Sequence, residues 1–410
     1  MSDPDSLAGV PKTPLKILIL THTRFPHEVR IEKEVGSLVA KGIQVTVVAN
    51  RTVTKNQVSE FRGVEVLYVW MVHPFGIPIL NPLGLMRILK GERYDAIQVY
   101  DAPLMPFAML LSIAFRIPLV YDAHDTWPLL TIYSSRSRLF GVASAPLHFI
   151  CEAITIHHSR KVVAVSEGMV DVFARYYRCS PSKVVIVRNL PSMIEIVDLE
   201  SARALSTEVA RPNSLRLVYF GTMDRLRTGE LSRFIRAISI LKNSSETEYT
   251  LKIIGGDVVH MLPPKALMDL AETLGVSDRV HFLGWVPMDE ALGVVASADV
   301  GLVGVEKNLY ADIALPQKLF QYMLVGVPIL TSELEEVKRL VGNGVSYYQD
   351  NAPESLAKTM EGIRRDLPAL RRRALELNQR ALRNLTWEND EEKYVSVFES
   401  LRGVTPHLGP

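Results

Sequence analysis

Short apolar runs alternate with helical patterns along nearly the whole chain, and this alternation restricts the fold more than any other feature. Strands that are apolar on both faces and separated by helices are typical of a parallel sheet covered by helices on both sides. The pattern therefore predicts an α/β protein with two doubly wound, Rossmann-like domains that face a central cleft. The expected strands are residues 16–20, 43–50, 64–70, 95–100, 118–122, 161–166 and 183–188 in the first half, and 216–220, 251–254, 279–283, 299–303, 328–330 and 345–348 in the second.

The alternation lapses in the middle of the chain, which divides it into two domains. At 410 residues and 48% hydrophobic content, the chain is long enough for two separate cores. We expect a flexible leader at residues 1–14, an N-terminal domain at 15–190, a linker at 191–214, a C-terminal domain at 215–385, and a closing helix with a tail at 386–410.

Charge and cysteine content exclude several classes of protein. The chain carries 46 Lys and Arg against 45 Asp and Glu, so its formal net charge is +1 and no overall field would attract nucleic acid. A phosphorylated ligand would have to be held by local charges. Two cysteines, Cys151 and Cys179, are too few for a disulfide framework or a structural zinc site. The polar N-terminus does not read as a secretion signal, so we expect a cytoplasmic protein.

The stretch from 102 to 120 is the most membrane-like part of the sequence. Three prolines and Arg116 interrupt it. A membrane-spanning helix needs about 20 apolar residues in a row. A buried helix followed by a buried strand is therefore the favoured interpretation.

The strands of the second half mostly run straight into glycine, at Gly221, Gly255 with Gly256, Gly284 and Gly304. Ligands of open α/β sheets bind at the carboxyl ends of the strands, where glycine lets the backbone come close. The chain has no GxGxxG after a strand, no P-loop, no HExxH and no GxSxG. Classical dehydrogenases, P-loop NTPases, zinc hydrolases and serine hydrolases therefore lose their main support.

The segment LPQKLFQYMLVGVPIL, residues 315–330, predicts a helix that begins at Pro316 and stops at Gly326. Its apolar residues form one buried stripe, and Lys318 and Gln321 share the opposite, outward edge. This edge is either a solvated polar face or an anion site, because free N–H groups and a lysine at a helix start both attract negative charge.

The sequence resembles the GT-B glycosyltransferases of the family 4 type. The resemblance rests on an ordered set of segments that covers almost the whole chain, and no single segment is specific by itself. The C-terminal segments are LVYFGTMDRLRTGELSRFIRAISIL, LKIIGGD, LGVSDRVHFLGWVPMDEALGVVASADVGLV and LPQKLFQYMLVGVPIL, and the others are FPHEVRIEKEVGSLVAKGIQVTVV, YDAHDTWP and LTWENDEEKYVSVFESL.

The resemblance implies an enzyme that transfers a sugar, with retention of anomeric configuration, from a nucleotide diphosphate sugar to a glycan, lipid-linked or small-molecule acceptor. Residues 215–385 would bind the nucleotide sugar and residues 15–190 would face the acceptor. No cofactor or metal would be required, so protein groups would neutralise the leaving diphosphate.

The resemblance also implies roles for individual residues. His124 would contact the donor sugar, and Arg225 or Arg227 would clamp the diphosphate. Gln321 falls on the ribose-binding position. The remaining expected sugar-nucleotide contacts are Gly221, which permits close backbone approach, Gly255 and Gly256 at the strand-end turn, Trp285 and Val286 at the base, and Leu315, Pro316, Gln317 and Lys318 at the phosphate-facing helix start.

The sequence departs from the family at its paired glutamates, which would fall on Ile313 and Gln321. Asp312, one residue out of register, is a candidate acidic substitute. A glutamine can still bond ribose hydroxyls through its amide, but it carries no charge. THTRFPHE replaces the glycine-rich first loop of the family. These gaps leave open whether activity is reduced.

Structural interpretations compete with several of these roles. His124 could be held by loop carbonyls beside an Asp125 helix cap, the two arginines could be loop surface charges, and Trp285 could be a packing residue. The basic run at 364–384 is most simply a solvated helix face. The alternative is attraction to anionic lipid, which would place a cytoplasmic protein peripherally at the inner face of the membrane.

Three functions are therefore compared. The leading hypothesis is a retaining glycosyltransferase. The second is a nucleotide-sugar epimerase of the same fold, whose acids and base we cannot assemble from these motifs. The third is a non-catalytic sugar-nucleotide-binding subunit that lost both glutamates.

Overall fold

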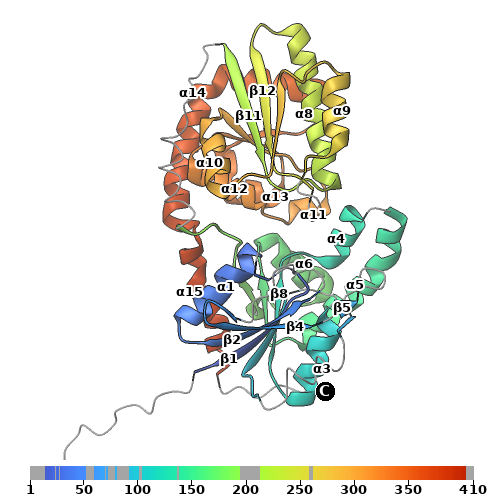
Figure 1. Cartoon of the computed structure of the whole chain (residues 1–410), viewed down its shortest axis with the longest axis vertical. Helices are drawn as coiled ribbons and strands as arrows, with labels where there is room; N and C mark the ends of the chain where they lie inside the picture. The colour runs from blue at the N-terminus through green and yellow to red at the C-terminus, as the bar shows by residue number, and fades with distance from the viewer. Residues whose placement is uncertain are drawn as a thin grey trace, which may run out of the picture.

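The computed structural model describes residues 14–23, 25–26, 28–51, 60–69, 71–72, 79–80, 92–100, 104–135, 138–193, 213–257 and 262–402. Nearly all of the expected leader, most of the expected linker, Trp70 of one expected strand and the last eight residues of the tail lie outside these ranges. Figure 1 shows two lobes stacked along the long axis, the N-terminal lobe below and the C-terminal lobe above. The prediction of an α/β protein with two parallel-sheet domains is confirmed.

The N-terminal domain is built on an eight-stranded sheet with the order β10-β9-β8-β7-β1-β2-β4-β3. Every pairing in it is parallel except that of β3 with β4. Each expected strand is present, and among the described strands of this domain the sequence pattern missed β3 and the separate β5–β6 pair. The strands are β1 (Lys16–Leu20), β2 (Gln44–Asn50), β3 (Glu60–Phe61), β4 (Val64–Val69), β5 (Met71–Val72), β6 (Ile79–Leu80), β7 (Ala96–Val99), β8 (Leu119–Ala123), β9 (Lys161–Ala164) and β10 (Val184–Ile186).

Helices cover both faces of this sheet, as a parallel sheet requires. One core contains buried side chains of α3, α5 and α6, and the other contains those of α1 and of the C-terminal helix α15. Local signals set some helix ends: the Ser166 hydroxyl caps α6 by accepting from the Met169 N–H at 3.1 Å. The helices are α1 (Val29–Ala40), α3 (Met105–Phe115), α4 (Trp127–Ser134), α5 (Arg138–His158), α6 (Glu167–Tyr177) and the 3-10 turn η3 (Pro181–Lys183).

The C-terminal domain has a six-stranded parallel sheet with the order β13-β12-β11-β14-β15-β16. The order reverses between β11 and β14, which is the switch point where doubly wound folds bind ligands. Its elements are β11 (Ser214–Phe220), α8 (Arg225–Ser244), β12 (Glu248–Ile254), α9 (Lys265–Thr273), β13 (Val280–Gly284), α10 (Met288–Ser297), β14 (Val300–Val303), α11 (Leu309–Asp312), α12 (Gln317–Val325), β15 (Ile329–Ser332), α13 (Glu335–Val341), η4 (Gly342–Gly344), β16 (Ser346–Tyr348), α14 (Pro353–Asn384) and α15 (Trp387–Glu399).

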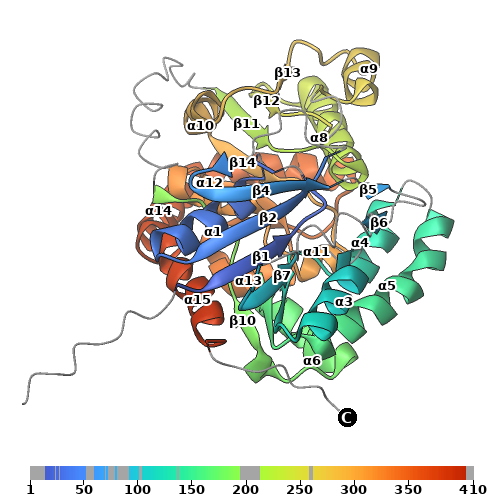
Figure 2. The same cartoon turned by 60° about the horizontal axis from the view of Figure 1, so that its bottom comes forward.

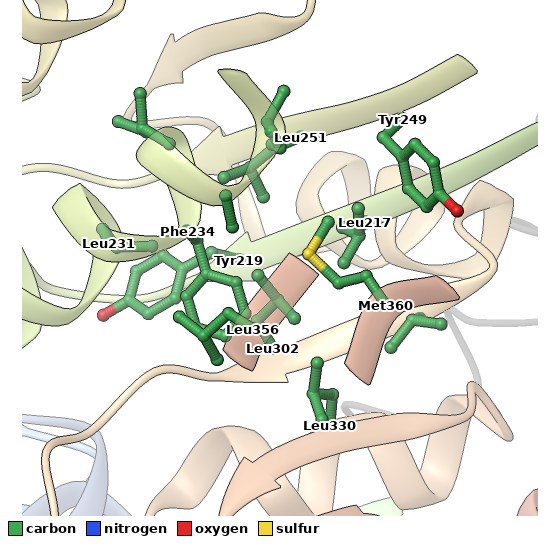
Figure 3. Close-up of a cluster of buried hydrophobic side chains, with 14 of the residues drawn as sticks. Leu217, Tyr219, Leu231, Phe234, Tyr249, Leu251, Leu302, Leu330, Leu356 and Met360 are labelled. Carbon is green, nitrogen blue, oxygen red and sulfur yellow. The ribbon is translucent and has the colours of Figure 1, made fainter. Parts of the chain in front are cut away.

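One core of this domain lies between the sheet and helices α8, α9 and α14. Figure 3 shows Leu217 and Tyr219 of β11 beside Phe234 of α8 and Met360 of α14, and all four side chains are buried. The Tyr219 ring also contacts Lys318 at the start of α12. The interior packing therefore continues up to the edge of the ligand cleft.

The chain returns to the N-terminal domain at its end, where α14 passes along one side of the C-terminal lobe and α15 docks on the N-terminal lobe below (Figure 1). The Trp387 indole N–H donates to Ser37 Oγ at 2.9 Å, and the Tyr394 hydroxyl donates to Gln98 Oε1 at 2.7 Å. Both side chains are buried in the core that α1 shares. The closing helix is thus an integral part of the N-terminal domain.

The strand ends of the C-terminal sheet approach one another closely at glycine. Gly255 has a φ of +112° and Gly221 a φ of +135°, both outside the range that other residues favour. A Cβ on Gly255 would overlap the carbonyl oxygen of Gly221. Glycine is therefore required for this contact between the ends of β11 and β12.

We predict that Trp387→Ala lowers the free energy of unfolding by about 3–5 kcal/mol, because a large buried side chain leaves a cavity. The matched change Trp285→Ala, at a side chain that is 64% exposed, should cost less than about 0.5 kcal/mol. Urea denaturation of the two variants tests this. Equal losses would contradict the docking of α15 on the N-terminal domain.

We also predict that Gly255→Ala destabilises the protein at least twice as much as Gly275→Ala. Both glycines have positive φ, at +112° and +65°, but a Cβ on Gly275 meets nothing within 4 Å. Gly275→Ala should therefore cost only the backbone term of about 1–2 kcal/mol. Thermal unfolding of both variants measures the difference, and equal destabilisation would mean that the Gly221–Gly255 contact relaxes freely.

Candidate functional site

A cleft of about 660 Å³ lies between the two domains at the carboxyl ends of their strands. The N-terminal domain contributes the segment that follows β1, and the C-terminal domain contributes the ends of β11, β12 and β13 with the start of α12. The lining residues are His22, Thr23, Glu28, Phe220, Gly221, Thr222, Arg227, Ile254, Gly255, Gly256, Asp257, Trp285, Val286, Met288, Pro316, Gln317, Lys318 and Gln321.

Lys318 is the most unusual side chain of this cleft. It is only 7% exposed, and its Nζ has no hydrogen-bond partner among the described residues. The Nζ lies 3.6 Å from the centroid of the Tyr219 ring, a cation–π contact that partly replaces water. Burial, followed by the nearby positive charge of Arg227, lowers the pKa of Lys318 well below its usual value. A buried ammonium without a counter-ion is a site prepared for an anion.

The start of α12 adds to this preference for negative charge. Pro316 precedes the helix and no side chain caps it, so the first N–H groups have no partner within the helix. The helix ends at Gly326, whose φ is +78°. The sequence placed Lys318 and Gln321 on an outward edge, but both are 7% exposed because the walls of the cleft enclose that edge. This burial excludes the interpretation as a solvated polar face.

Of the two arginines after Gly221, the structure brings only Arg227 to the cleft. Asp224 caps α8, with its Oδ1 accepting from the Arg227 N–H at 2.9 Å, and its Oδ2 pairs with the Arg227 guanidinium. Burial lowers the pKa of Arg227, but the Asp224 charge, together with those of Tyr219, Tyr310 and Asp125, more than offsets this, so the pKa is raised and the group stays charged. Arg225 is exposed and donates to the Ser135 carbonyl at 3.3 Å, away from the lining.

The other expected C-terminal contacts mostly lie where they were predicted to lie. Gln321 and Met288 face each other, with 3.9 Å between Gln321 Nε2 and Met288 Sδ. Trp285 is 64% exposed and lines the cleft with Val286. Leu315 instead packs against the domain core.

The N-terminal wall of the cleft was not assigned from the sequence. His22, Thr23 and Glu28 reach it from THTRFPHE, the segment that replaces the glycine-rich loop. They follow the carboxyl end of β1, and the strand-end rule that identified Gly221 would have found them. They supply the only carboxylate and imidazole that the described part of the N-terminal domain brings to the lining.

His124 follows β8 and stands outside the lining of the cleft. Its Nε2 lies 3.6 Å from Asp122 Oδ1, and its ring contacts the edge of Tyr100, with 4.9 Å between the centroids. The Asp122 carboxylate therefore lies within ion-pair distance of the imidazole. Asp125, proposed from the sequence as a cap, accepts from the Tyr310 hydroxyl of the other domain at 2.7 Å.

Next to this histidine, Arg30, Glu34 and Asp122 form a buried network of charged groups. Arg30 donates to Glu34 Oε1 at 2.7 Å and to Asp122 Oδ1 at 3.0 Å. Burial, followed by the Asp122 charge, raises the pKa of Glu34 to about 7. Glu34, Asp122 and His124 could also approach one metal ion. The guanidinium of Arg30 already supplies positive charge to both carboxylates, so we assign no metal there.

The structure does not bring the candidate acidic substitute into the cleft. Asp312 Oδ1 accepts from the Glu335 N–H at 3.3 Å and lies 3.9 Å from Lys307 Nζ. Ile313 packs against the core of the N-terminal domain, and its carbonyl accepts from Ser166 Oγ at 2.5 Å. Ile313 thus contributes to the contact between the domains, Asp312 is held within the C-terminal domain, and neither residue lines the cleft.

Comparisons with known proteins agree with this geometry. Residues 27–190 match Glycosyltransferase Family 4 and residues 214–366 match Glycosyl transferases group 1. The chain is 21% identical to the D-inositol 3-phosphate glycosyltransferase of Corynebacterium diphtheriae, over 77% of this chain and 73% of that protein. It is also 21% identical to the MMP alpha-(1->4)-mannosyltransferase of Mycolicibacterium hassiacum, over 82% and 78%.

Solved structures show the same fold. The sucrose-phosphate synthase of Thermosynechococcus elongatus has a TM-score of 0.73 at 14% identity, with 95% of this chain and 99% of that chain covered. The Anabaena protein HepE, solved in complex with UDP-glucose, has a TM-score of 0.71 at 15% identity, with 94% and 100% covered. The chain therefore belongs to the group 1 glycosyltransferases of the family 4 type, enzymes with the GT-B fold.

Proposed function

We propose that this glycosyltransferase uses a nucleotide diphosphate sugar and transfers the sugar with retention of configuration. The observation that carries the proposal is Lys318, a buried ammonium that faces the cleft without a partner among the described residues. A ligand diphosphate would supply the missing negative charge. The complex of HepE with UDP-glucose supports a uridine nucleotide as the first candidate.

The C-terminal wall offers a complete set of contacts for such a nucleotide. The diphosphate would lie between Lys318, Arg227 and the start of α12. Because Gly221 has no side chain, the protein backbone at this residue could come close to the diphosphate. Gln321 would bond the ribose through its uncharged amide. Trp285 and Val286 would contact the base. Because all these groups line one cleft, a single extended ligand can reach them together.

The sugar would then point toward the N-terminal wall, where the acceptor enters. Sugar transfer builds negative charge on the leaving diphosphate, and fixed cations stabilise that charge. Lys318 and Arg227 supply two, so we propose that no metal is required. Glu28 and His22 would bind acceptor hydroxyls or the donor sugar. The acceptor is a glycan, a lipid-linked sugar or a small molecule.

A panel of nucleotide diphosphate sugars tests this function. We expect transfer, or slow hydrolysis of one sugar donor, that persists in a metal chelator, and NMR of the product should show the anomeric configuration of the donor. Release of an isomerised sugar would favour an epimerase. Binding without turnover, with any acceptor, would favour a non-catalytic subunit. Inversion at the anomeric carbon would contradict retention.

The lowered pKa of Lys318 predicts that diphosphate binding takes up a proton at any pH between the pKa of the free protein and that of the complex. Phosphate charge favours the ammonium, so binding moves the pKa back toward the usual value of 10.5. Between the two values the free side chain is neutral and the bound one is charged. Affinity should therefore fall as pH rises through this window. Calorimetry in buffers with different ionisation enthalpies measures the proton uptake.

The corresponding nucleoside is the control, because it has no phosphate and should bind without this proton uptake. Lys318→Ala should abolish the uptake and weaken diphosphate binding by roughly 10- to 100-fold, the value of a charge-assisted contact. Lys307→Ala, at a lysine that is 45% exposed and outside the lining, should change neither. Equal losses for nucleoside and diphosphate would show that Lys318 does not meet phosphate.

His124→Ala should lower the turnover rate about tenfold or more, which is about 1.4 kcal/mol of barrier, and leave nucleotide diphosphate affinity near wild type. His124 lies outside the lining of the cleft, so we propose that the sugar end of the bound donor extends past this lining and meets the imidazole as charge develops, while the other domain holds the phosphates. His281→Ala, at an exposed histidine of β13, is the matched control. Unchanged turnover in a folded His124→Ala variant would leave the histidine a purely structural role.

A further inference from the structure

An apolar stripe runs along the outer face of α5. Its members are Leu139, Val142, Leu147, Ile150 and Ile154, which are 86%, 53%, 53%, 54% and 48% exposed. Their spacing places them on one side of the helix. The stripe is about 23 Å long at a rise of 1.5 Å per residue. Figures 1 and 2 show α5 at the outer edge of the N-terminal lobe, with no other element beyond it.

The opposite side of α5 is anchored in the domain. The buried Glu152 accepts from the Tyr121 hydroxyl at 2.8 Å and from the Tyr177 hydroxyl at 2.5 Å. By length and composition Leu139–His158 could cross a membrane, and 28% of it is buried inside the protein. Because its inner side packs with β8 and α6, the helix lies on the surface of the domain with its apolar side outward.

Helix α3, which packs against α5, widens this face. Leu110, Ile113 and Phe115 are 56%, 48% and 50% exposed. Soluble proteins rarely expose adjoining apolar side chains on this scale unless another surface covers them. The only acidic residue of α3 and α5 is the buried Glu152, so no exposed carboxylate of these helices would repel an anionic partner.

A basic pocket of about 930 Å³ adjoins the stripe, at the ends of α3 and α5 and the starts of β8 and β9. Ile154 belongs to both. The pocket is lined by serines, apolar side chains and the basic residues His157, His158, Arg160, Lys161 and Lys183, and no Asp or Glu occurs among its described lining. Burial lowers the pKa of Lys183, and the Arg160 charge lowers it further. Crowded cations of this kind favour a bound anion.

We propose that the outer face of α3 and α5 docks on an anionic lipid bilayer, with the apolar stripe in the interfacial layer and a lipid phosphate in the basic pocket. Apolar side chains flanked by basic groups match the two zones of such a surface. The stripe begins at Leu139, close after Ser135, which meets the C-terminal domain at the Arg225 contact. If the proposed acceptor is lipid-linked, this docking would deliver it near the cleft.

The basic run of α14 fits a bilayer less well. Its apolar side is buried against the C-terminal core, and its exposed side mixes basic residues with Asp366 and Glu376. Arg371 is paired with Asp299 at 2.6 Å. The structure thus supports the solvated-face interpretation for residues 364–384 and moves the membrane contact to the other domain.

Cosedimentation of the full chain with lipid vesicles tests the proposal. We expect binding to vesicles of phosphatidylcholine mixed with phosphatidylglycerol, little binding to phosphatidylcholine alone, and release by added salt. Arg160→Gln with Lys161→Gln should lower the partition coefficient by roughly 25-fold, at about fivefold per basic residue. Arg372→Gln with Arg380→Gln on α14 is the matched charge control and should have little effect.

A second pair of variants tests the contribution of the apolar stripe to vesicle binding. Leu147→Glu with Ile150→Glu should lower vesicle binding about tenfold or more, while Leu375→Glu with Leu382→Glu, at exposed leucines of α14, should not. Nucleotide affinity and melting temperature should stay unchanged in both. Absent binding to anionic vesicles, or equal losses in the α14 controls, would overturn the proposal. So would a dimer, seen by light scattering, that Leu147→Glu with Ile150→Glu dissociates.

Discussion

A lysine ammonium kept out of water without a carboxylate partner among the described residues is the interaction on which the functional account depends. Moving a charge away from water is costly, and a protein normally pairs such a group or neutralises it. Here the ring of Tyr219 is the close neighbour of Lys318 Nζ. Burial of Lys318 therefore costs the folded protein free energy, and a ligand anion that paired with the ammonium in the cleft would offset this cost.

The surrounding fold keeps this arrangement fixed. Lys318 sits at the start of α12, a helix in which every residue from Lys318 to Val325 is buried. The strand ends that face it come together only because Gly221 and Gly255 adopt positive φ. The Tyr322 hydroxyl accepts from the Phe220 N–H at 3.0 Å and so ties α12 to the end of β11. Packing and backbone geometry together hold the lysine where it cannot reach solvent.

Both domains contribute to the cleft, so their relative position matters for chemistry. The Tyr310 hydroxyl and Asp125 join them directly, and α15 returns to the core of the N-terminal domain. The histidine after β8 lies within ion-pair distance of Asp122, which Arg30 and Gln98 hold in place. Contacts between residues that do not line the cleft thus set the positions of the site residues.

The sequence predicted the fold and the C-terminal wall because both depend on local patterns. Alternating strands and helices, strand-end glycines and the Pro316 helix start are visible without tertiary information. The burial of Lys318 and Gln321 was not visible, since it depends on Tyr219, Gly221 and Met288, which lie far from them in the sequence. The choice between Arg225 and Arg227 depended on where Asp224 caps α8. Asp312 failed as a substitute acid because Lys307 and the start of α13 hold its carboxylate elsewhere.

The sequence also could not predict which helix faces are exposed, because periodicity shows which helices are amphipathic but not what covers them. The sequence analysis did not single out helix α5, and only its exposed side chains revealed the stripe. A crystal structure of the protein with uridine diphosphate tests the central claim most directly. The account predicts a phosphate within hydrogen-bond distance of Lys318 Nζ and beside the first N–H groups of α12. A nucleotide bound elsewhere, or one whose phosphates point to solvent and leave Lys318 unpaired, would contradict it.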